Sequence, residues 1–460
     1  MFYSACYLPY KQYVNFDEFY NKSISIFATM HILSQVLFAG ILAVAVYFFY
    51  ANLKRIRRNI YLGRDWDVQG SSAMRWKNML RVALGQSKMV RKPTAGFLHI
   101  LVYAGFILIN IEVMEIMIDG LLGTHRALSF IGPLYDIAIG FFEILAFLVL
   151  LACVIFLFRR YVLQLGRFKS PDLKGFANRD AVIILATEII LMSALLFMNA
   201  ADQQLQALGN EHYFQAGSFP VSQFLVALYG SASESKLIIA ERSLWWAHLI
   251  GILVFLNYLP YSKHFHIILA FPNTFYARFQ PKGEFSNLEN VTKEVKLAFF
   301  PDEPVDESKE LPKTFGVKDV QDLTWKNLMD AYTCTECGRC TSQCPANITG
   351  KLLSPRKIMM STRDRLEEVG RNLDKKVTDE KSLHDYITPE ELWACTSCNA
   401  CVEACPVEIS PLEIIMDMRR YLVMEKSEAP QELNMMSSNI ENNGAPWQFA
   451  QSERLGWVNS

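Results

Sequence analysis

Eight of the ten cysteines occur in two runs with the same spacing. The first run holds Cys334, Cys337, Cys340 and Cys344, the second holds Cys395, Cys398, Cys401 and Cys405, and a proline follows each run. Gaps of two residues let three thiolates of one tight loop reach three irons of a 4Fe-4S cube, while the fourth thiolate reaches the neighbouring cube. The spacing therefore predicts two clusters. Cluster one takes Cys334, Cys337, Cys340 and Cys405, and cluster two takes Cys395, Cys398, Cys401 and Cys344.

Zinc is the main alternative for these cysteines, because paired Cys-x-x-Cys units also bind zinc. A zinc ribbon needs neither a third and fourth cysteine in each run nor the closing Cys-Pro, so the pattern favours iron–sulfur clusters. Disulfides are disfavoured, because the topology derived below places this part of the chain in a reducing cytoplasm.

The segments around the cysteines predict helices. Pro355–Asp374 is charged and helix-favouring, Thr388–Glu391 is a helix start signal, and another helix is expected from Pro411 to about Lys426. Few segments alternate as strands do. We therefore expect an α-helical two-cluster ferredoxin domain over residues 321–426.

The first half of the chain must position these cofactors at a membrane. Five apolar runs approach or exceed the roughly 20 residues that a helix needs to cross a bilayer. They are Ile24–Tyr50, Ala95–Ile118, Pro133–Phe158, Ala181–Ala201 and Leu244–Leu259, the last continuing past a predicted kink at Pro260 to Phe271. The expected architecture is all-α, with an outer segment 1–23, a membrane domain 24–271, a linker 272–320, the ferredoxin domain and a partner-contacting tail 427–460. No removable signal peptide is predicted.

Loop charges predict the orientation. Residues 54–92 carry 11 lysines and arginines and residues 159–179 carry six, whereas the other two loops hold only Arg126, Lys236 and Arg242. By the positive-inside rule, the N-terminus lies outside and the ferredoxin domain lies in the cytoplasm. The composition is 51% hydrophobic with a net charge of -1, which argues against disorder and against nucleic-acid binding.

Histidines in or near the spans are candidates for haem ligation, because a low-spin haem takes two imidazoles from facing helices. His99 and His266 fall near the inner face, and His31 and His248 fall near the outer face. His248 and His266 are 18 residues apart, or five helical turns, which favours His266 over His264. For His31, packing is an equally good interpretation.

Other polar residues receive weaker interpretations. His125 and His212 are expected to be solvated in outer loops. Glu143 and Glu188 could serve a proton path or a quinone pocket, although hydrogen bonding between helices explains them equally well. Cys153 is expected to pack in the third span.

The five spans, with His99, His248 and the run Pro260–His266, resemble the gamma (cytochrome b) subunit of respiratory nitrate reductase. The membrane subunits of heterodisulfide reductase and of the sulfite-reductase-linked complex are similar. The resemblance implies an inner haem b on His99 and His266. The outer haem's histidine on the second span is replaced here by Ile109, so His31 is our candidate partner for His248.

The cysteine-rich half resembles the iron–sulfur domain of heterodisulfide reductase and of anaerobic glycerol-3-phosphate dehydrogenase. Together the resemblances imply a subunit of a quinone-linked oxidoreductase in a bacterial or archaeal cytoplasmic membrane. Electron transfer flavoprotein:menaquinone oxidoreductase is the expected type, with a heterodisulfide-reductase-like complex as the alternative.

Several partners and cofactors follow from this resemblance. We expect one or two haems b, quinone (menaquinone) as substrate, lipid contact, a separate cytoplasmic iron–sulfur subunit with Cys-Cys-Gly domains, and electron transfer flavoprotein as a further partner, with the direction of electron flow left open. A membrane-anchored iron–sulfur redox sensor and a proton transporter are the rival functions. Proton transport alone needs no iron–sulfur relay, which weighs against the transporter.

Overall fold

The computed structural model describes residues 16–281, 283–302, 312 and 314–458, and for residues 16–31 it describes the backbone alone. Within these residues the chain forms helices and no strand. The one isolated bridge in the described part joins Arg64 and Thr324. The expected all-α class is confirmed.

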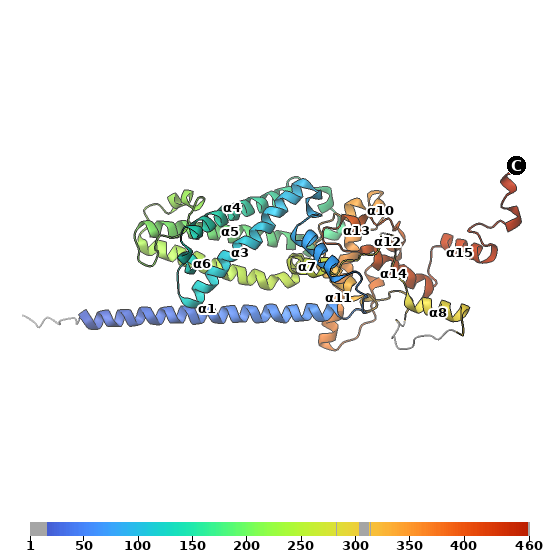
Figure 1. Cartoon of the computed structure of the whole chain (residues 1–460), viewed down its shortest axis with the longest axis horizontal. Helices are drawn as coiled ribbons and strands as arrows, with labels where there is room; N and C mark the ends of the chain where they lie inside the picture. The colour runs from blue at the N-terminus through green and yellow to red at the C-terminus, as the bar shows by residue number, and fades with distance from the viewer. Residues whose placement is uncertain (1–15, 282, 303–311, 313, 459–460) are drawn as a thin grey trace, which may run out of the picture. The chain divides into compact units, whose positions relative to one another are not determined.

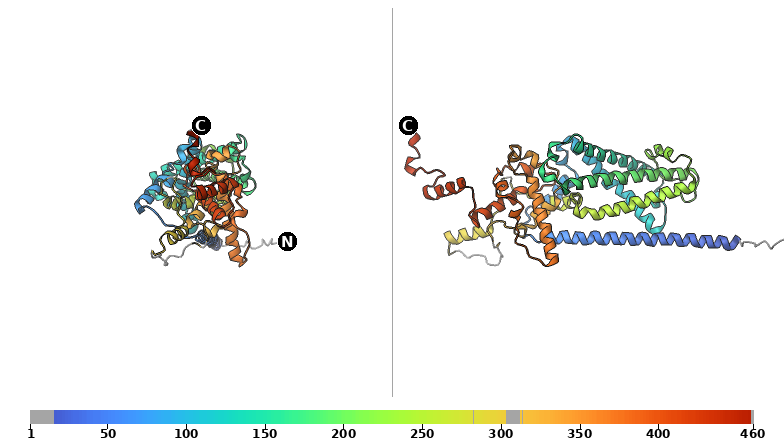
Figure 2. Two further views of the ribbon diagram at one scale, coloured as in Figure 1. Left: turned by 90° about the vertical axis from the view of Figure 1, so that its right-hand side faces the viewer. Right: turned by 180° about the vertical axis from the view of Figure 1, so that it is seen from behind.

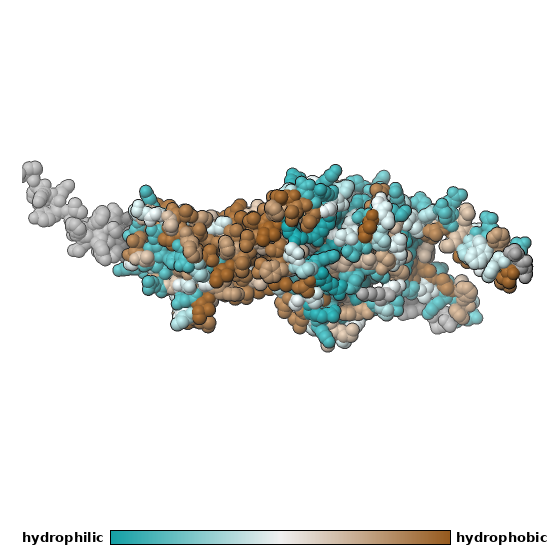
Figure 3. All heavy atoms as spheres, turned by 90° about the horizontal axis from the view of Figure 1, so that it is seen from above, coloured by the Kyte–Doolittle hydropathy of each residue, from teal (hydrophilic) through white to brown (hydrophobic). Residues whose placement is uncertain are grey.

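Five helices are long and apolar enough to cross a membrane. They are α1 (Phe16–Ile60), α3 (Pro93–Leu122), α4 (Pro133–Tyr161), α5 (Phe176–Ala207) and α6 (Glu234–Tyr258), and they coincide with the five predicted spans. On the face seen in Figure 3, hydrophobic residues gather over these long helices. Such an exposed apolar surface needs lipid rather than water around it.

The predicted kink at Pro260 is wrong, because the helix ends there. After α6 ends at Tyr258, the chain makes two 3-10 turns, Leu259–Tyr261 and Lys263–Phe265, before α7 (His266–Phe275) begins. The Ser262 hydroxyl caps the second turn by accepting a hydrogen bond from the His264 amide at 3.0 Å. Because His248 and His266 lie in two separate helices, helical phase does not favour His266 over His264.

The chain divides into two compact units. Unit 1 comprises Met1–Phe49, Leu101–Cys153 and Thr187–Asn257, and unit 2 comprises Tyr50–Ile100, Val154–Ala186 and Tyr258–Ser460. In unit 1, helices α4, α5 and α6 run side by side (Figures 1 and 2). Contacts between neighbouring helices include the hydrogen bond from Asn199 to Glu143 at 3.4 Å.

Unit 2 contains the whole cysteine-rich domain. Its core is formed by α9 (Trp325–Thr333), α11 (Pro355–Lys375) and α14 (Pro411–Met424), which bury Leu328, Ile358 and Ile415 completely. Thr324 and Thr388 form capping boxes with Asn327 and Glu391 at their helix starts. The three helices predicted for this domain are present as α11, α12 (Pro389–Trp393) and α14.

Shorter helices complete unit 2. They are α2 (Ser72–Met79), α8 (Glu289–Phe299), α10 (Pro345–Ile348), α12 (Pro389–Trp393), α13 (Ala400–Ala404) and α15 (Gln431–Asn443). The loops before α3 and between α4 and α5 also belong to unit 2. Two basic loops therefore lie in the same compact unit as the cysteines.

Candidate redox centres

The two cysteine runs form loops with the same backbone pattern. Glu336 and Gly338 have positive φ values of 54° and 71° in the first loop, and Ser397 and Asn399 have values of 55° and 60° at the matching positions of the second. Left-handed residues at these positions curl each loop tightly. Such curling suits three sulfurs that converge on one cluster.

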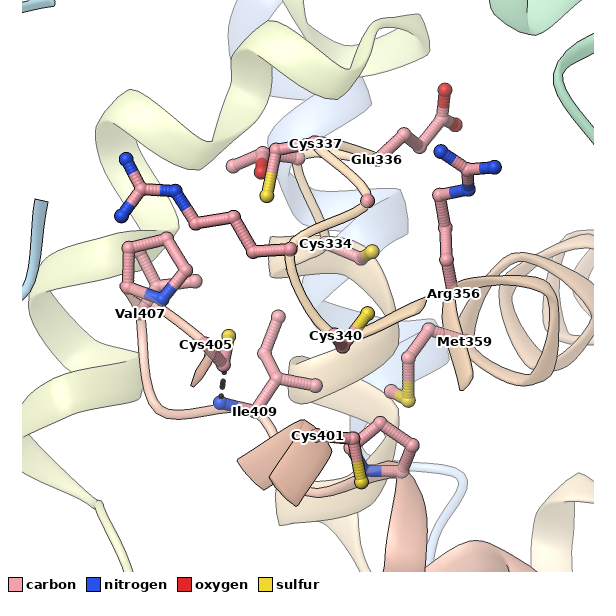
Figure 4. A pocket seen from close by; sticks show the side chains of 15 residues that line it. Cys334, Glu336, Cys337, Cys340, Arg356, Met359, Cys401, Cys405, Val407 and Ile409 are labelled. Carbon is pink, nitrogen blue, oxygen red and sulfur yellow. Dashed lines mark hydrogen bonds between the residues drawn. The ribbon is translucent and has the colours of Figure 1, made fainter. Parts of the chain in front are cut away.

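The first loop surrounds a pocket that receives sulfurs from both runs. The pocket is lined by Cys334, Cys337, Cys340, Cys405 and the neighbouring Cys401, and Figure 4 shows their side chains around it. The Ile409 amide donates a hydrogen bond to Cys405 Sγ at 3.3 Å. Amide donors to sulfur are one of the ways by which proteins tune iron–sulfur clusters.

Electrostatic interactions connect the thiols of the two runs, and Cys340 of the first run interacts with both Cys405 and Cys401 of the second. Burial raises the pKa of Cys405 to about 12, and Cys337 and Cys334 raise it as well. Burial raises the pKa of Cys401 to about 12, with Cys395, Cys344 and Cys398 acting in the same direction.

The interactions of Cys405 with Cys334 and Cys337, and of Cys401 with Cys344, cross between the two runs, as the predicted ligand sets do, and the sets themselves stay a prediction. Cys334, Cys344, Cys401 and Cys405 are buried, and buried thiolates need a compensating positive charge, which iron supplies. No three His, Cys, Asp or Glu side chains in the described part of the chain are placed to hold a single metal ion. Thiolates contributed by two such loops are the donor set of 4Fe-4S cubes.

A buried ion-pair network holds the first loop in place. The Glu336 carboxylate is 5% exposed and accepts hydrogen bonds from Lys263 Nζ at 2.5 Å and Arg363 Nη2 at 2.7 Å. Burial alone would raise the pKa of Glu336, but Arg363 and Lys263 together lower it. Arg339, also in this loop, donates to the carbonyl oxygens of Lys88 and Met89 at 3.1 and 3.0 Å.

Arg356 of α11 supports the same loop from its other side. It is 1% exposed and pairs bidentately with Asp172, at 2.9 and 2.7 Å, in the loop between α4 and α5. A Cβ on Gly338 would lie only 2.6 Å from the Arg356 guanidinium. The guanidinium thus fits against a backbone position that only glycine leaves open.

Replacing Arg356 should destabilise this domain strongly. Arg356→Met leaves Asp172 buried without its partner, which costs about 3–5 kcal/mol. Arg371→Met on the same helix is the matched control, because the Arg371–Glu367 pair is long at 3.9 Å and Arg371 is 57% exposed. The control should cost at most about 1 kcal/mol. Thermal loss of the iron–sulfur absorbance compares the two variants, and equal losses would contradict the assignment.

His99 and His266, both in unit 2, lie with their ring centres 6.5 Å apart. Two imidazoles that share one metal ion at metal–nitrogen distances of about 2 Å have ring centres about 6 Å apart. His266 Nδ1 donates to the Lys263 carbonyl oxygen at 3.0 Å, which leaves Nε2 unprotonated for a metal. His99 Nδ1 is buried without a hydrogen-bond partner among the described residues. The pair fits a haem iron.

His264 also lies in this cluster, with its ring centre 5.6 Å from that of His266. The restart of the helix at His266 brings both histidines beside His99, so mutation rather than helical phase must distinguish them.

His248 in unit 1 has one satisfied and one unsatisfied ring nitrogen. Its Nδ1 donates to the Leu191 carbonyl oxygen at 3.0 Å, while Nε2 is buried with no partner in the described part of the chain. An unpaired buried nitrogen is costly, and a metal ligand is oriented in this way. The His31 side chain lies outside the described residues, so its pairing with His248 stays a prediction.

The structure corrects or refines three weaker predictions. His125 is not solvated, since its side chain is 8% exposed and its Nε2 lies 3.3 Å from Asp202, whereas His212 is exposed as expected. Glu143 accepts hydrogen bonds from the Val221 and Ser222 amides at 2.8 and 3.2 Å, so it anchors a loop. Cys153 is fully buried, as expected for packing.

Comparison with known proteins defines the class of the cysteine-rich domain. Residues 333–409 match the family model described as a 4Fe-4S dicluster domain. The chain therefore joins a 4Fe-4S dicluster domain to five helices that could span a membrane.

Curated relatives are oxidoreductases. The "Probable iron-sulfur-binding oxidoreductase FadF" of Bacillus subtilis is 29% identical over 459 residues, covering 93% of this chain and 61% of that protein. The "EtfAB:quinone oxidoreductase" of Syntrophomonas wolfei is 27% identical over 414 residues, covering 82% of this chain and 52% of that protein. A protein of Archaeoglobus profundus, named for its likeness to a heterodisulfide reductase subunit, is 35% identical over 92 residues, covering 20% of this chain and 40% of that protein.

No solved structure matches the chain. The chain spans between half and two thirds of the length of the two relatives that it matches over most of its own length. These relatives indicate a membrane-anchored iron–sulfur electron-transfer oxidoreductase subunit.

Proposed function

We propose that this chain passes electrons between a cytoplasmic redox partner and the membrane quinone pool, through two 4Fe-4S clusters and haem b. These cofactors supply one-electron transfer when bound, and the residues of the chain hold them, bury them and fix their spacing. Cluster one uses Cys334, Cys337, Cys340 and Cys405, cluster two uses Cys395, Cys398, Cys401 and Cys344, and the inner haem uses His99 and His266.

One observation carries this proposal. The loop of cluster one and the His99–His266 pair lie in the same compact unit and are joined by Lys263. Its Nζ donates to Glu336 in the cysteine loop at 2.5 Å, and its carbonyl oxygen accepts the Nδ1 proton of His266 at 3.0 Å. A cluster site and a haem site that share one rigid support keep a constant separation, which electron transfer requires.

Cluster two is the better candidate for contact with a soluble partner. Cys398 is exposed, whereas Cys334 and Cys405 are buried. Arg419 holds the second loop by donating to the Leu392 and Cys395 carbonyl oxygens at 2.8 and 2.6 Å. The second loop is therefore rigid and also accessible.

The relatives guide the choice of partner. Two relatives match 93% and 82% of the chain, and the second is named for EtfAB and quinone. The heterodisulfide reductase relative matches only 20% of it. We therefore favour electron transfer flavoprotein as donor and menaquinone as acceptor, with a separate Cys-Cys-Gly protein as intermediary. A heterodisulfide-reductase-like role is the second candidate.

Anaerobic mixing of the purified protein with menadiol, a soluble menaquinol analogue, tests the proposal. The expected result is reduction of a b-type haem, followed by its reoxidation with menadione. His99→Ala should abolish the change in the inner haem, whereas the exposed His212→Ala should leave it intact. Clusters without haem, combined with no response to menadiol, would contradict electron transfer to quinone and favour the redox sensor.

A further inference from the structure

The loop between α4 and α5 forms a basic hollow beside the ends of two candidate membrane spans. The hollow is lined by Arg160, Phe168, Lys169, Lys174 and Asn178, among others, with no acidic side chain among its described lining residues. Arg160 lies in the last turn of α4, and Asn178 lies in the first turn of α5. The hollow therefore opens where both helices meet the membrane surface.

Positive charge exceeds negative charge throughout this region. Residues 159–180 contain six lysines and arginines and only two acids, Asp172 and Asp180. Both acids are engaged elsewhere, because Asp172 pairs with Arg356 at 2.7 Å and Asp180 accepts from Tyr258 and the Lys263 amide at 2.6 and 3.1 Å. The basic side chains of the hollow are thus left without local neutralisation.

The basic side chains around the hollow are not paired with carboxylates of this loop. Lys169 and Lys174 are exposed, and neither makes an ion pair or a side-chain hydrogen bond to another described residue. The guanidinium groups of Arg160 and Arg167 lie 5.0 and 4.8 Å from the centre of the same Phe168 ring. Arg160 is oriented by Asn178 Oδ1 at 2.9 and 2.7 Å. Cations gathered in this way favour an anionic ligand.

We propose that this hollow binds the phosphate of an anionic phospholipid, such as phosphatidylglycerol. Arg160, Lys169 and Lys174 would contact the phosphate, and the exposed apolar Tyr161, Val162 and Leu163 at the end of α4 would contact the acyl chains. Basic pockets between membrane helices on one face are typical sites for anionic headgroups. The proposal depends on α4 and α5 crossing a membrane and is independent of the proposed electron transfer.

The same loop also packs against α11, whose Arg356 supports the first cysteine loop, and Leu173 of the hollow's lining makes this contact. Leu173 is 3% exposed and packs with Ala177 and with Met360 of α11, next to the Asp172–Arg356 pair. Lipid binding should therefore stabilise the contact between this loop and α11. Bound anionic lipid is expected to raise the temperature at which the iron–sulfur absorbance is lost.

Lipid titration of the delipidated full-length protein in detergent tests the proposal. The probes are phosphatidylglycerol, zwitterionic phosphatidylcholine and inorganic phosphate, and native mass spectrometry counts the bound molecules. Because each basic residue near a membrane surface contributes about fivefold in affinity for anionic lipid, Lys169→Gln with Lys174→Gln should weaken phosphatidylglycerol binding about 25-fold. Lys351→Gln with Lys375→Gln, which removes two exposed lysines of the cysteine-rich domain, should change little.

Each alternative outcome overturns the proposal. Equal affinity for phosphatidylglycerol and phosphatidylcholine would show that the headgroup charge is not recognised. Tight binding of inorganic phosphate that displaces the lipid would identify a soluble anion as the ligand. Equal weakening in the two double variants would show general charge attraction rather than this site. Iron content, measured on each variant, confirms that the compared proteins are folded.

Discussion

Replacing Cys405 with alanine is expected to remove cluster one and to leave cluster two in place. Cys405 belongs to the second run in sequence, yet its thiol lines the pocket formed by the first loop. Cys405→Ala should therefore lower the non-haem iron content from about eight atoms per chain to about four, because each cube contains four irons. Electron paramagnetic resonance of the reduced protein should retain a single cluster signal.

Cys398→Ala is the matched comparison, because Cys398 lies in the same run but is grouped with the other set of thiols. Cys398→Ala should remove cluster two and leave the paramagnetic resonance signal of cluster one. The two variants together test the crossing of ligands between the runs. Loss of the same signal in both variants would show that each run binds its own cluster and would refute the assignment of Cys405.

Replacing His99 with alanine should abolish the inner haem while preserving both clusters. His99 and His266 provide imidazoles with ring centres 6.5 Å apart, and removal of one leaves the iron with a single protein ligand. His266→Ala should have the same effect, since His266 Nδ1 is held by the Lys263 carbonyl oxygen. The loss of a full haem b per chain is measurable by the pyridine haemochrome absorbance.

His264→Ala decides between the two neighbouring histidines. His264 lies close to His266, and the restart of the chain as α7 removes the helical phase relation that would have excluded it. We expect His264→Ala to retain its haem with unchanged intensity. If His264→Ala loses the haem and His266→Ala keeps it, the ligand is His264.

Much of the fold was predictable because its signals are local. Cysteine spacing, apolar run length, loop charge and capping residues such as Thr388 act over a few residues, so the five long helices and the helical cysteine-rich domain follow from them. The two cysteine runs also share their backbone conformation, because Gly338 and Asn399, at matching positions of the runs, both have positive φ values.

The support around the candidate sites could not be predicted, because it joins residues distant in sequence. Arg356 and Asp172 are 184 residues apart, and Glu336 and Lys263 are 73 residues apart. A charged residue in a polar segment gives no sign of the partner that it meets after folding. The loop residue His125 is a further example, since its buried ring lies 3.3 Å from Asp202, which is 77 residues away in α5.

The end of α6 shows the limit of periodicity. Pro260 predicts an interruption of the helix, and proline is compatible with either a kink or a helix end. Two 3-10 turns and a cap by Ser262 make it an end, and this allows His266 to begin a new helix. The outcome depends on the packing of these turns and not on the apolar pattern.

The most direct test of the proposed electron-transfer chain is a reduced-minus-oxidised optical spectrum of the purified full-length protein, with haem and iron quantified on the same sample. We predict a b-type haem spectrum together with about eight cluster irons per chain. A second haem would support the role of His248, and one haem would leave the His99–His266 site as the only one. Iron–sulfur clusters without any haem, or zinc in place of iron, would contradict the proposed chain of cofactors.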